Sequence, residues 1–264
     1  MTITVAYKLS ERGEFRPKLI APLYPAVQSI YAKYLPSQVG QCKKKFLNTT
    51  ATSKAMLTML GYDGDNKNMR DFIKKGYHLP LDLVRVQQSK VDENLWLDKK
   101  YRLNTVRLRA VRRTNSTRIR KEKKFNELMQ TAHNKNTSNG SKNTSNSLKQ
   151  DLKQFSNFQK TLKNLITDPT FNPGCLTDQQ IKNFVKNGPE RMIFTMAGCD
   201  ILRDEGVIFA NRLKNIGGAE LEMVVDEGMP HGYFSLAPVL GGIIGGYDVV
   251  VKNWLRSVDR IINC

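Results

Sequence analysis

The sequence contains few metal-binding side chains, and those it has are scattered. Its four cysteines lie at positions 42, 175, 199 and 264, and its three histidines at positions 78, 133 and 231. No two cysteines have the CxxC spacing, and no cysteine lies near a histidine at the spacing of a zinc site. The sequence therefore predicts neither a metal site nor a cofactor.

Long hydrophobic runs are also absent. No apolar stretch approaches the roughly 20 residues that cross a bilayer, and residues 1–10 are too short and too polar at the front for a secretory signal. As written, the chain is expected to be soluble. Acidic residues are few as well, with 24 Asp and Glu against 42 Lys and Arg, so the formal net charge is +18.

What the sequence does contain is a strand, an acidic turn, a helix and a second strand in succession. Residues 192–197 form an apolar run without polar alternation, which predicts a strand buried on both faces of a parallel sheet. Residues 204–215 carry apolar side chains at helical spacing, with acids in the first turn and two glycines just after the end. Residues 219–225 predict another strand, and residues 226–234 a loop rich in Gly and Pro. The fold class predicted is α/β.

A carboxylate and an imidazole follow the two predicted strands. Asp200 comes directly after the first strand and His231, 31 residues later, after the second. Parallel strands place their carboxyl ends at one edge of the sheet, so both side chains are expected there. The order acid then base is that of the last two members of an α/β-hydrolase triad. Taken alone, each residue has a plainer explanation, since a lone Asp is usually a turn former and a lone His usually structural.

The sequence around these two residues has a familiar form. Residues 198–206 (GCDILRDEG) and 227–233 (EGMPHGY) closely resemble the carboxy-terminal motifs of the hormone-sensitive-lipase and arylacetamide-deacetylase group of esterases, the α/β hydrolase fold-3 family. Of the three acids in the first motif, that family uses the one at the position of Asp200. The resemblance implies that Asp200 orients His231 and that His231 acts as general base and then acid.

Upstream sequence extends the resemblance but lacks the nucleophile. Residues 2–9 predict a helix and residues 18–26 a buried strand that resembles the family's strand ending in Tyr-Pro. In that family a G-x-S-x-G elbow precedes this helix, and here it would lie before Met1. No serine of the chain lies in such a motif, and the HG-rich turn that supplies oxyanion-hole amides is absent. The chain therefore resembles the carboxy-terminal half of an esterase and is expected to be inactive alone.

The middle of the chain falls outside the family pattern. From Lys99 to Lys124 there are twelve Lys or Arg against one acid, Glu122, and residues 133–150 are an Asn/Ser/Thr/Lys-rich low-complexity segment. The simplest interpretation is a solvated, disordered insertion. An anionic membrane surface is the alternative partner, whereas the lack of interleaved aromatic residues argues against nucleic acid. We thus expect α/β-hydrolase parts at 1–98 and 162–264, separated by a basic insertion at 99–161.

Other segments match the family less specifically. Residues 34–37 and 52–62 resemble the deacetylase branch, where the second forms a helix on the lid side, and its apolar spacing also fits plain core packing. His78 has no acidic neighbour in sequence and is expected to be structural. A short helix is predicted to end at Phe184, and a helix laid on a sheet face over residues 247–262.

The function implied by the resemblance is that of a serine carboxylic-ester hydrolase or deacetylase acting on an ester, an acetylated small molecule or a lipid. The alternative is a non-catalytic fragment or binding module with a basic membrane-surface insertion. Such a module would have to cover an apolar, unpaired sheet edge. For a full-length form the family suggests the endoplasmic reticulum membrane.

Overall fold

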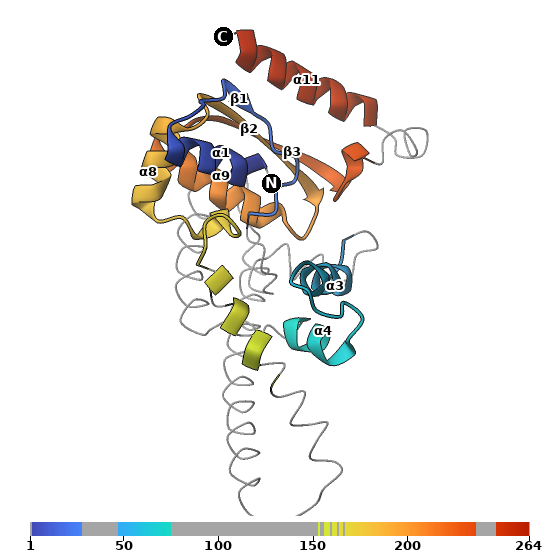
Figure 1. Ribbon diagram of the computed structural model, residues 1–264. Helices are drawn as coiled ribbons and strands as arrows, with labels where there is room; N and C mark the ends of the chain where they lie inside the picture. The colour runs from blue at the N-terminus through green and yellow to red at the C-terminus, as the bar shows by residue number, and fades with distance from the viewer. Residues whose placement is uncertain are drawn as a thin grey trace, which may run out of the picture.

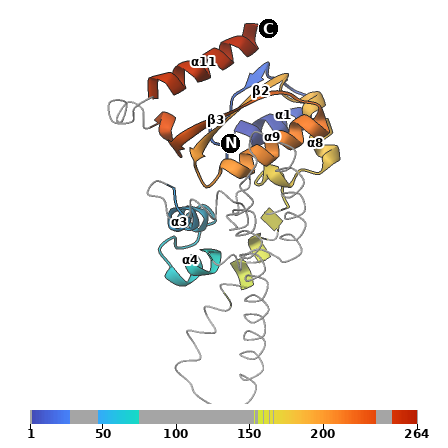
Figure 2. The ribbon, with the colours of Figure 1, turned by 180° about the vertical axis from the view of Figure 1, so that it is seen from behind.

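The computed structural model describes residues 2–27, 47–74, 167–235 and 247–263, together with positions 153, 156–158, 160–162, 164 and 165. Within these residues a parallel sheet lies between two sets of helices (Figures 1 and 2). Helices α1 (Thr2–Arg12), α8 (Asp178–Asn187) and α9 (Arg203–Gly217) cover one face, and α11 (Tyr247–Asn263) lies over the other. The predicted α/β class is confirmed, with a parallel sheet and flanking helices.

The sheet has three strands in the order β1 (Leu19–Ile20), β2 (Arg191–Cys199) and β3 (Glu220–Pro230), and all three run parallel. The central strand is buried from Met192 to Gly198, as its unbroken apolar sequence predicts. Met192, Phe194 and Met196 belong to the main core under α1 and α9. Because successive side chains of a strand point to opposite faces, Ile193 and Thr195 lie on the face of α11.

Helix α9 connects β2 to β3. It has Asp204 and Glu205 in its first turn, and it ends at Gly218, whose φ of 72° is the left-handed conformation that favours glycine at this position. Val207, Phe209, Ala210 and Leu213 of its apolar face are all buried. The helix predicted over 204–215 is therefore confirmed, with one more residue at its start and two at its end. This helix fixes the length of the crossover that separates Asp200 from His231.

Two helices pack together beside α9. Helix α8 begins with a capping box in which Thr177 and Gln180 bond each other's backbone N–H groups, and it packs against α1 through the Tyr7 and Phe184 rings, 5.9 Å apart and edge to face. The hydroxyl of Tyr7 donates to Glu11 at 2.5 Å. Burial and this bond to Glu11 raise the pKa of Tyr7 well above its usual range. The predicted helix of residues 2–9 is therefore present and extends three residues further.

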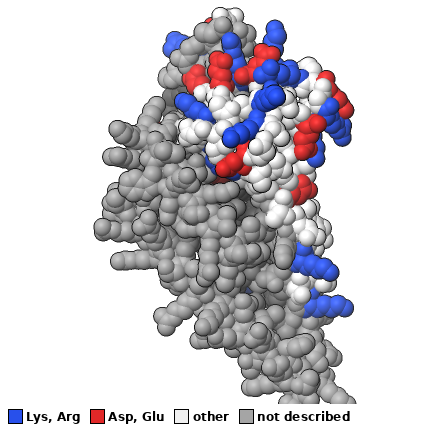
Figure 3. Space-filling view, turned by 90° about the vertical axis from the view of Figure 1, so that its left-hand side faces the viewer, with Lys and Arg blue, Asp and Glu red and all other residues white. Residues whose placement is uncertain are grey.

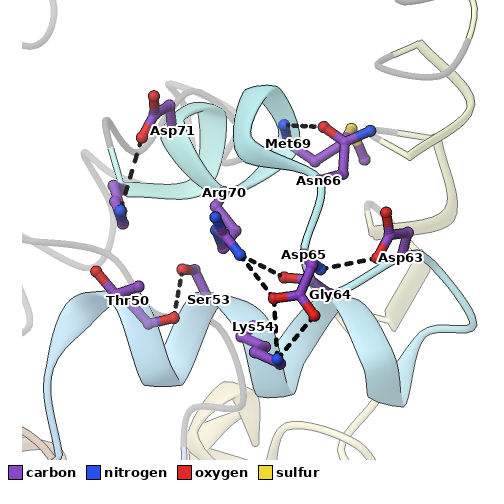
Figure 4. Close-up of polar contacts among 11 residues, drawn as sticks. Thr50, Ser53, Lys54, Asp63, Gly64, Asp65, Asn66, Met69, Arg70 and Asp71 are labelled. Atoms are coloured by element: carbon purple, nitrogen blue, oxygen red, sulfur yellow. Dashed lines mark hydrogen bonds and ion pairs between the residues drawn. The ribbon is translucent and has the colours of Figure 1, made fainter.

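Helices α3 (Thr49–Met59) and α4 (Lys67–Lys74) lie side by side, below the sheet in Figures 1 and 2. The Asn48 side chain caps α3 by accepting from the amides of Thr50 and Ala51. The carboxylate of Asp65 then joins the two helices, accepting from Lys54 of α3 at 2.8 Å and from Arg70 of α4 at 3.0 Å (Figure 4). Helical structure predicted from residues 52–62 is thus observed.

Two strand boundaries differ from those expected. The strand predicted over 18–26 is regular only at Leu19–Ile20, with one isolated bridge from Leu23 to Thr195. Pro22 and Pro25 lack the backbone N–H that a regular ladder requires. The loop predicted over 226–234 is wrong for residues 226–230, because β3 continues to Pro230.

The extension of β3 depends on a close approach of two backbones. Its register with β2 shifts between Ala197, which pairs with Asp226, and Cys199, which pairs with Pro230. At Gly198 an added Cβ would lie 2.8 Å from the Cα of Glu227. Only glycine fits at that point, so this residue allows the two strands to stay paired up to the edge where the motifs end.

Charges of both signs are intermixed on one side of the described surface. On the side that Figure 3 shows, Lys and Arg lie among Asp and Glu rather than in a patch of one sign. The basic run at 99–124 and the low-complexity segment at 133–150 lie outside the described residues. Of the helices that the described ranges contain, none is long and apolar enough to cross a membrane.

Candidate active site

Asp200 lies directly after β2, in the turn that leads to α9. Its side chain is buried, and its Oδ1 accepts a hydrogen bond of 3.0 Å from the amide of Leu202, two residues on. Its backbone oxygen accepts from the amide of Arg203 at 3.4 Å. An Asp whose side chain bonds the backbone two residues later stabilises a tight turn. Oδ1 thus stabilises the turn, and Oδ2 is available to a second partner.

His231 follows β3, and the structure brings it to Asp200. Its Nδ1 lies 2.7 Å from the Oδ2 of Asp200. The Asp200 side chain is 0% exposed and that of His231 is 29% exposed, so solvent reaches the imidazole but not the carboxylate. Because β2 and β3 are adjacent and parallel, both residues stand at the same sheet edge. The juxtaposition predicted from the 31-residue spacing is observed.

The two other acids of the motif have different partners. The Asp204 carboxylate pairs with the Nε of Arg203 at 2.8 Å. The Oε1 of Glu205 accepts from the amide of Val27 at 2.9 Å. Both acids are buried in the first turn of α9, where the helix dipole favours negative charge. Their positions explain why Asp200, and neither of its neighbours, meets the histidine.

Arg203 ties the acid turn back to the end of β2. Its Nη1 donates to the carbonyl of Gly198 at 3.2 Å while its Nε pairs with Asp204. Burial lowers the pKa of Arg203, but the Asp204 carboxylate, with a smaller contribution from Glu227, more than offsets this, so the guanidinium pKa is raised and the charge is firmly held. Arg203 therefore links the turn that carries Asp200 to the end of β2 on one side and to the first turn of α9 on the other.

Three residues around the histidine have no counterpart among the sequence-based site predictions. The ring of Tyr24 lies 5.0 Å from the His231 ring and 5.6 Å from the Tyr233 ring, measured between centroids. The hydroxyl of Tyr233 donates to the buried carboxylate of Asp226 on β3. The sequence signals for this arrangement are the Tyr-Pro at 24–25 and the Tyr that ends the motif at 227–233, which the resemblance singles out without a role. Asp226 lies in the range 226–234, which the sequence predicts to be a loop.

Chemically, this arrangement fixes a histidine tautomer. A carboxylate facing Nδ1 favours the proton on that nitrogen, and the lone pair then resides on Nε2, where it can accept a proton from a nucleophile. The described residues include no serine in a G-x-S-x-G elbow, and the full sequence contains none either. In the parts of the chain that the structure describes, no group of three or more His, Cys, Asp or Glu side chains is arranged to hold a metal ion.

Several predicted features cannot be placed. His78, His133, Cys42 and Cys264 lie outside the described residues, as does most of the predicted insertion at 99–161. The expected boundaries at 98 and 162 therefore stay predictions. Of the two cysteines that the structure describes, Cys175 and Cys199, neither is in a disulfide.

Comparison with known proteins gives a family match. Residues 120–235 match the family model described as alpha/beta hydrolase fold, a range that begins inside the segment expected to be an insertion and ends just past His231. No curated protein matches the chain. Among solved structures the chain is similar to carboxyl esterase 2 (TmelEST2) from the mycorrhizal fungus Tuber melanosporum, with 12% identity and a TM-score of 0.46. That match covers 94% of this chain and 46% of the fungal chain, so the chain spans about half the length of that esterase.

The matched range contains both strands, the crossover helix and the paired Asp200 and His231. The resemblance noted from the motifs at 198–206 and 227–233 therefore agrees with the family match. Residues 120–235, less than half of the chain, thus match the α/β hydrolase family.

Proposed function

We propose that this chain provides the acid and the base of a serine carboxylic-ester hydrolase. The observation that carries the proposal is the distance of 2.7 Å between the Nδ1 of His231 and the Oδ2 of Asp200, at neighbouring strand ends. In this role the Asp200 carboxylate orients the imidazole. His231 takes the proton of a serine hydroxyl and then returns it to the leaving group.

The G-x-S-x-G elbow and the HG-rich turn that would supply the serine and the oxyanion donors of this reaction do not occur in the 264 residues. We therefore propose that the chain alone does not hydrolyse esters, and that activity requires sequence or a partner that supplies both parts. The reaction would be acyl transfer through a covalent acyl-serine, which water then hydrolyses.

The finer assignments rest on sequence resemblance. The likeness of residues 34–37 and 52–62 to the deacetylase branch favours an acetylated small molecule or a lipid ester as substrate. The same likeness is the ground for proposing an endoplasmic reticulum membrane for a full-length form. The basic run at 99–124 would suit an anionic membrane surface in that setting.

A fluorophosphonate probe, which labels only activated serines, tests the proposal. The 264-residue chain should not be labelled, whereas the product of the native transcript, extended upstream of the codon for Met1, should be. Changing His231→Ala in the extended form should abolish labelling and hydrolysis of short p-nitrophenyl esters. Labelling of a serine within residues 1–264, or full activity of the His231→Ala form, would contradict the proposal. So would the lack of labelling in every form.

A further inference from the structure

The histidine turn is closed by a side-chain hydrogen bond. Asp226 lies in β3, His231 follows the end of that strand, and Tyr233 lies two residues later. The Tyr233 hydroxyl donates to the Oδ2 of Asp226, seven residues back. Both partners are buried, at 1% and 9% exposure. The bond therefore closes a segment of backbone that contains the histidine.

The backbone of this segment is paired with β2 only up to Pro230, the residue directly before His231. Gly228 and Gly232 have φ values of 80° and 76°, and no atom lies within 4 Å of an added Cβ at either position. Glycine has more conformational freedom than any other residue, so the backbone that follows Pro230 at Gly232 does little to hold the imidazole in one position. Side chains supply further restraint.

Tyr24 supplies a second contact to the same group of residues. Its amide donates to the carbonyl of Thr195 in β2 at 2.6 Å, and its φ of 35° is the one positive value at a non-glycine position in the described ranges. This bond fixes the residue against the central strand. Its ring contacts both the His231 and Tyr233 rings. The histidine is therefore connected to the sheet through Tyr233 and Tyr24 as well as through its own strand.

We propose that Tyr233 is a positioning residue for His231: its hydroxyl, anchored on Asp226, and its ring, packed on Tyr24, keep the imidazole within hydrogen-bond distance of Asp200. Its importance for catalysis rests on the proposed function, but its effect on the geometry of His231 does not. Tyr233 itself touches no reacting atom.

The environment of Asp226 supports a bond of this kind. Burial raises the pKa of the Asp226 carboxyl, and the hydrogen bond from Tyr233 opposes part of that rise. A buried carboxyl group without a hydrogen-bond partner destabilises the folded state. The Asp226 carboxyl therefore favours conformations in which the Tyr233 hydroxyl stays bonded to it. The Tyr233 ring also packs on Phe234 at 4.6 Å, so removal of the hydroxyl alone leaves its apolar packing in place.

The test is proton NMR of the 264-residue chain with labelled histidine. The chain has three histidines, and the His231→Ala spectrum identifies the Hδ1 signal of His231 by its loss. In Tyr233→Phe, exchange of this proton with water should speed up about tenfold, the factor that corresponds to the net value of one hydrogen bond. The matched control is Tyr62→Phe. It removes the hydroxyl of a ring packed edge to face on Phe158 at 5.0 Å and should leave the exchange unchanged.

A cooperatively melting Tyr233→Phe with wild-type exchange of the His231 proton would overturn the proposal. If that variant does not fold, proton exchange in the wild-type chain tests the proposal instead. The Hδ1 of His231 and the hydroxyl proton of Tyr233 should then exchange through one common opening, with equal opening free energies. A histidine proton that exchanges tenfold or more faster than a protected tyrosine proton would overturn it. Because no substrate is needed, a protected His231 in the 264-residue chain together with an extended form that lacks esterase activity would count against the proposed function only.

Discussion

The amide of Val27 donates a hydrogen bond of 2.9 Å to the Oε1 of Glu205, a residue 178 positions further along the chain. Both residues are almost completely buried. The bond fixes the backbone that leaves β1 to the first turn of α9, next to the turn that carries Asp200. Residues far apart in sequence thus support the same edge of the sheet.

Removal of the Glu205 carboxylate tests this connection. Glu205→Ala should lower the free energy of unfolding by about 1–3 kcal/mol, because the buried amide of Val27 loses its acceptor. The matched variant Glu205→Gln keeps an acceptor oxygen and should cost clearly less. Urea unfolding measures both values, and equal losses in the two variants would show that the bond contributes nothing specific.

Asp200→Asn tests the proposed role of the acid, in a form of the protein that hydrolyses esters. An amide can present its NH₂ group to the imidazole and favour the wrong tautomer, a change that costs about 10⁴-fold in kcat in a serine protease of another fold. We expect a loss of that order with little change in the melting temperature. Asp65→Asn is the control, since Asp65 is an exposed ion-pair residue between α3 and α4. Retention of activity within tenfold in Asp200→Asn would rule out the proposed role.

The buried Asp226 predicts a stability that falls as pH rises. Its folded-state pKa is raised, so between the unfolded value of about 3.9 and the folded value the folded form binds more protons. The free energy of unfolding should therefore decline across this window and then level off. Asp226→Asn should remove that decline, as seen in urea unfolding from pH 4 upward.

Asp168 provides a control of opposite sign. Its pKa is lowered by hydrogen bonds from the hydroxyl and amide of Thr170, so its contribution to stability is present above the unfolded pKa and is lost as pH falls. Asp168→Asn should lose stability relative to the wild type as pH rises, the reverse of the change in Asp226→Asn. The same sign of pH dependence in both variants would contradict the assignment.

Gly198→Ala should disturb the junction of β2 and β3. Its added methyl group would lie 2.8 Å from the Cα of Glu227 and 3.0 Å from the Asp226 carbonyl oxygen, and backbone cannot yield as a side chain can. We expect a loss of about 1–3 kcal/mol in the free energy of unfolding. In Gly206→Ala the nearest atoms belong to the flexible Met196 side chain, so the cost should be smaller. Thermal melts of the two variants make the comparison.

Arg212 is the buried cation of α9 that joins it to the segment before α8. Its Nη2 donates to the carbonyl of Leu176 at 2.6 Å and pairs with Asp178 at 3.0 Å, while its Nη1 donates to the carbonyl of Gly174. Lysine cannot reproduce this forked arrangement, so Arg212→Lys should cost about 2–4 kcal/mol of unfolding free energy. Arg12→Lys, at an exposed ion pair 3.9 Å long, should cost close to nothing. Similar losses in both would show that the fork is not needed.

The elements that sequence predicts well are those with uninterrupted patterns. The buried strand at 192–197 and the helix at 204–215 have one dominant period and clear ends, so only a residue or two changes at their boundaries. The pairing of Asp200 with His231 followed from the rule that parallel strands end at one edge. No comparable rule was available for the nucleophile, whose motif the chain does not contain.

The elements that sequence predicts poorly depend on contacts across the sheet. Gly228 and Pro230 carry the signals of a loop, yet Pro230 pairs with Cys199 because Gly198 lets the strands approach. The anchor between Asp226 and Tyr233 forms only once the chain has turned back at Gly232. To predict such features one must know where the neighbouring strand lies, and the local periodicity of the sequence does not give that information.

The acid and the base of this site both belong to one β2–α9–β3 crossover. Their separation of 31 residues makes the contact local on the scale of the fold, so loop closure costs little entropy, and the pair can assemble as soon as β3 docks on β2. Asp200 and His231 therefore belong to one local structural unit. Their relative geometry can be kept when other parts of the molecule change. A nucleophile carried by another segment would have to fit a partner that is already in place.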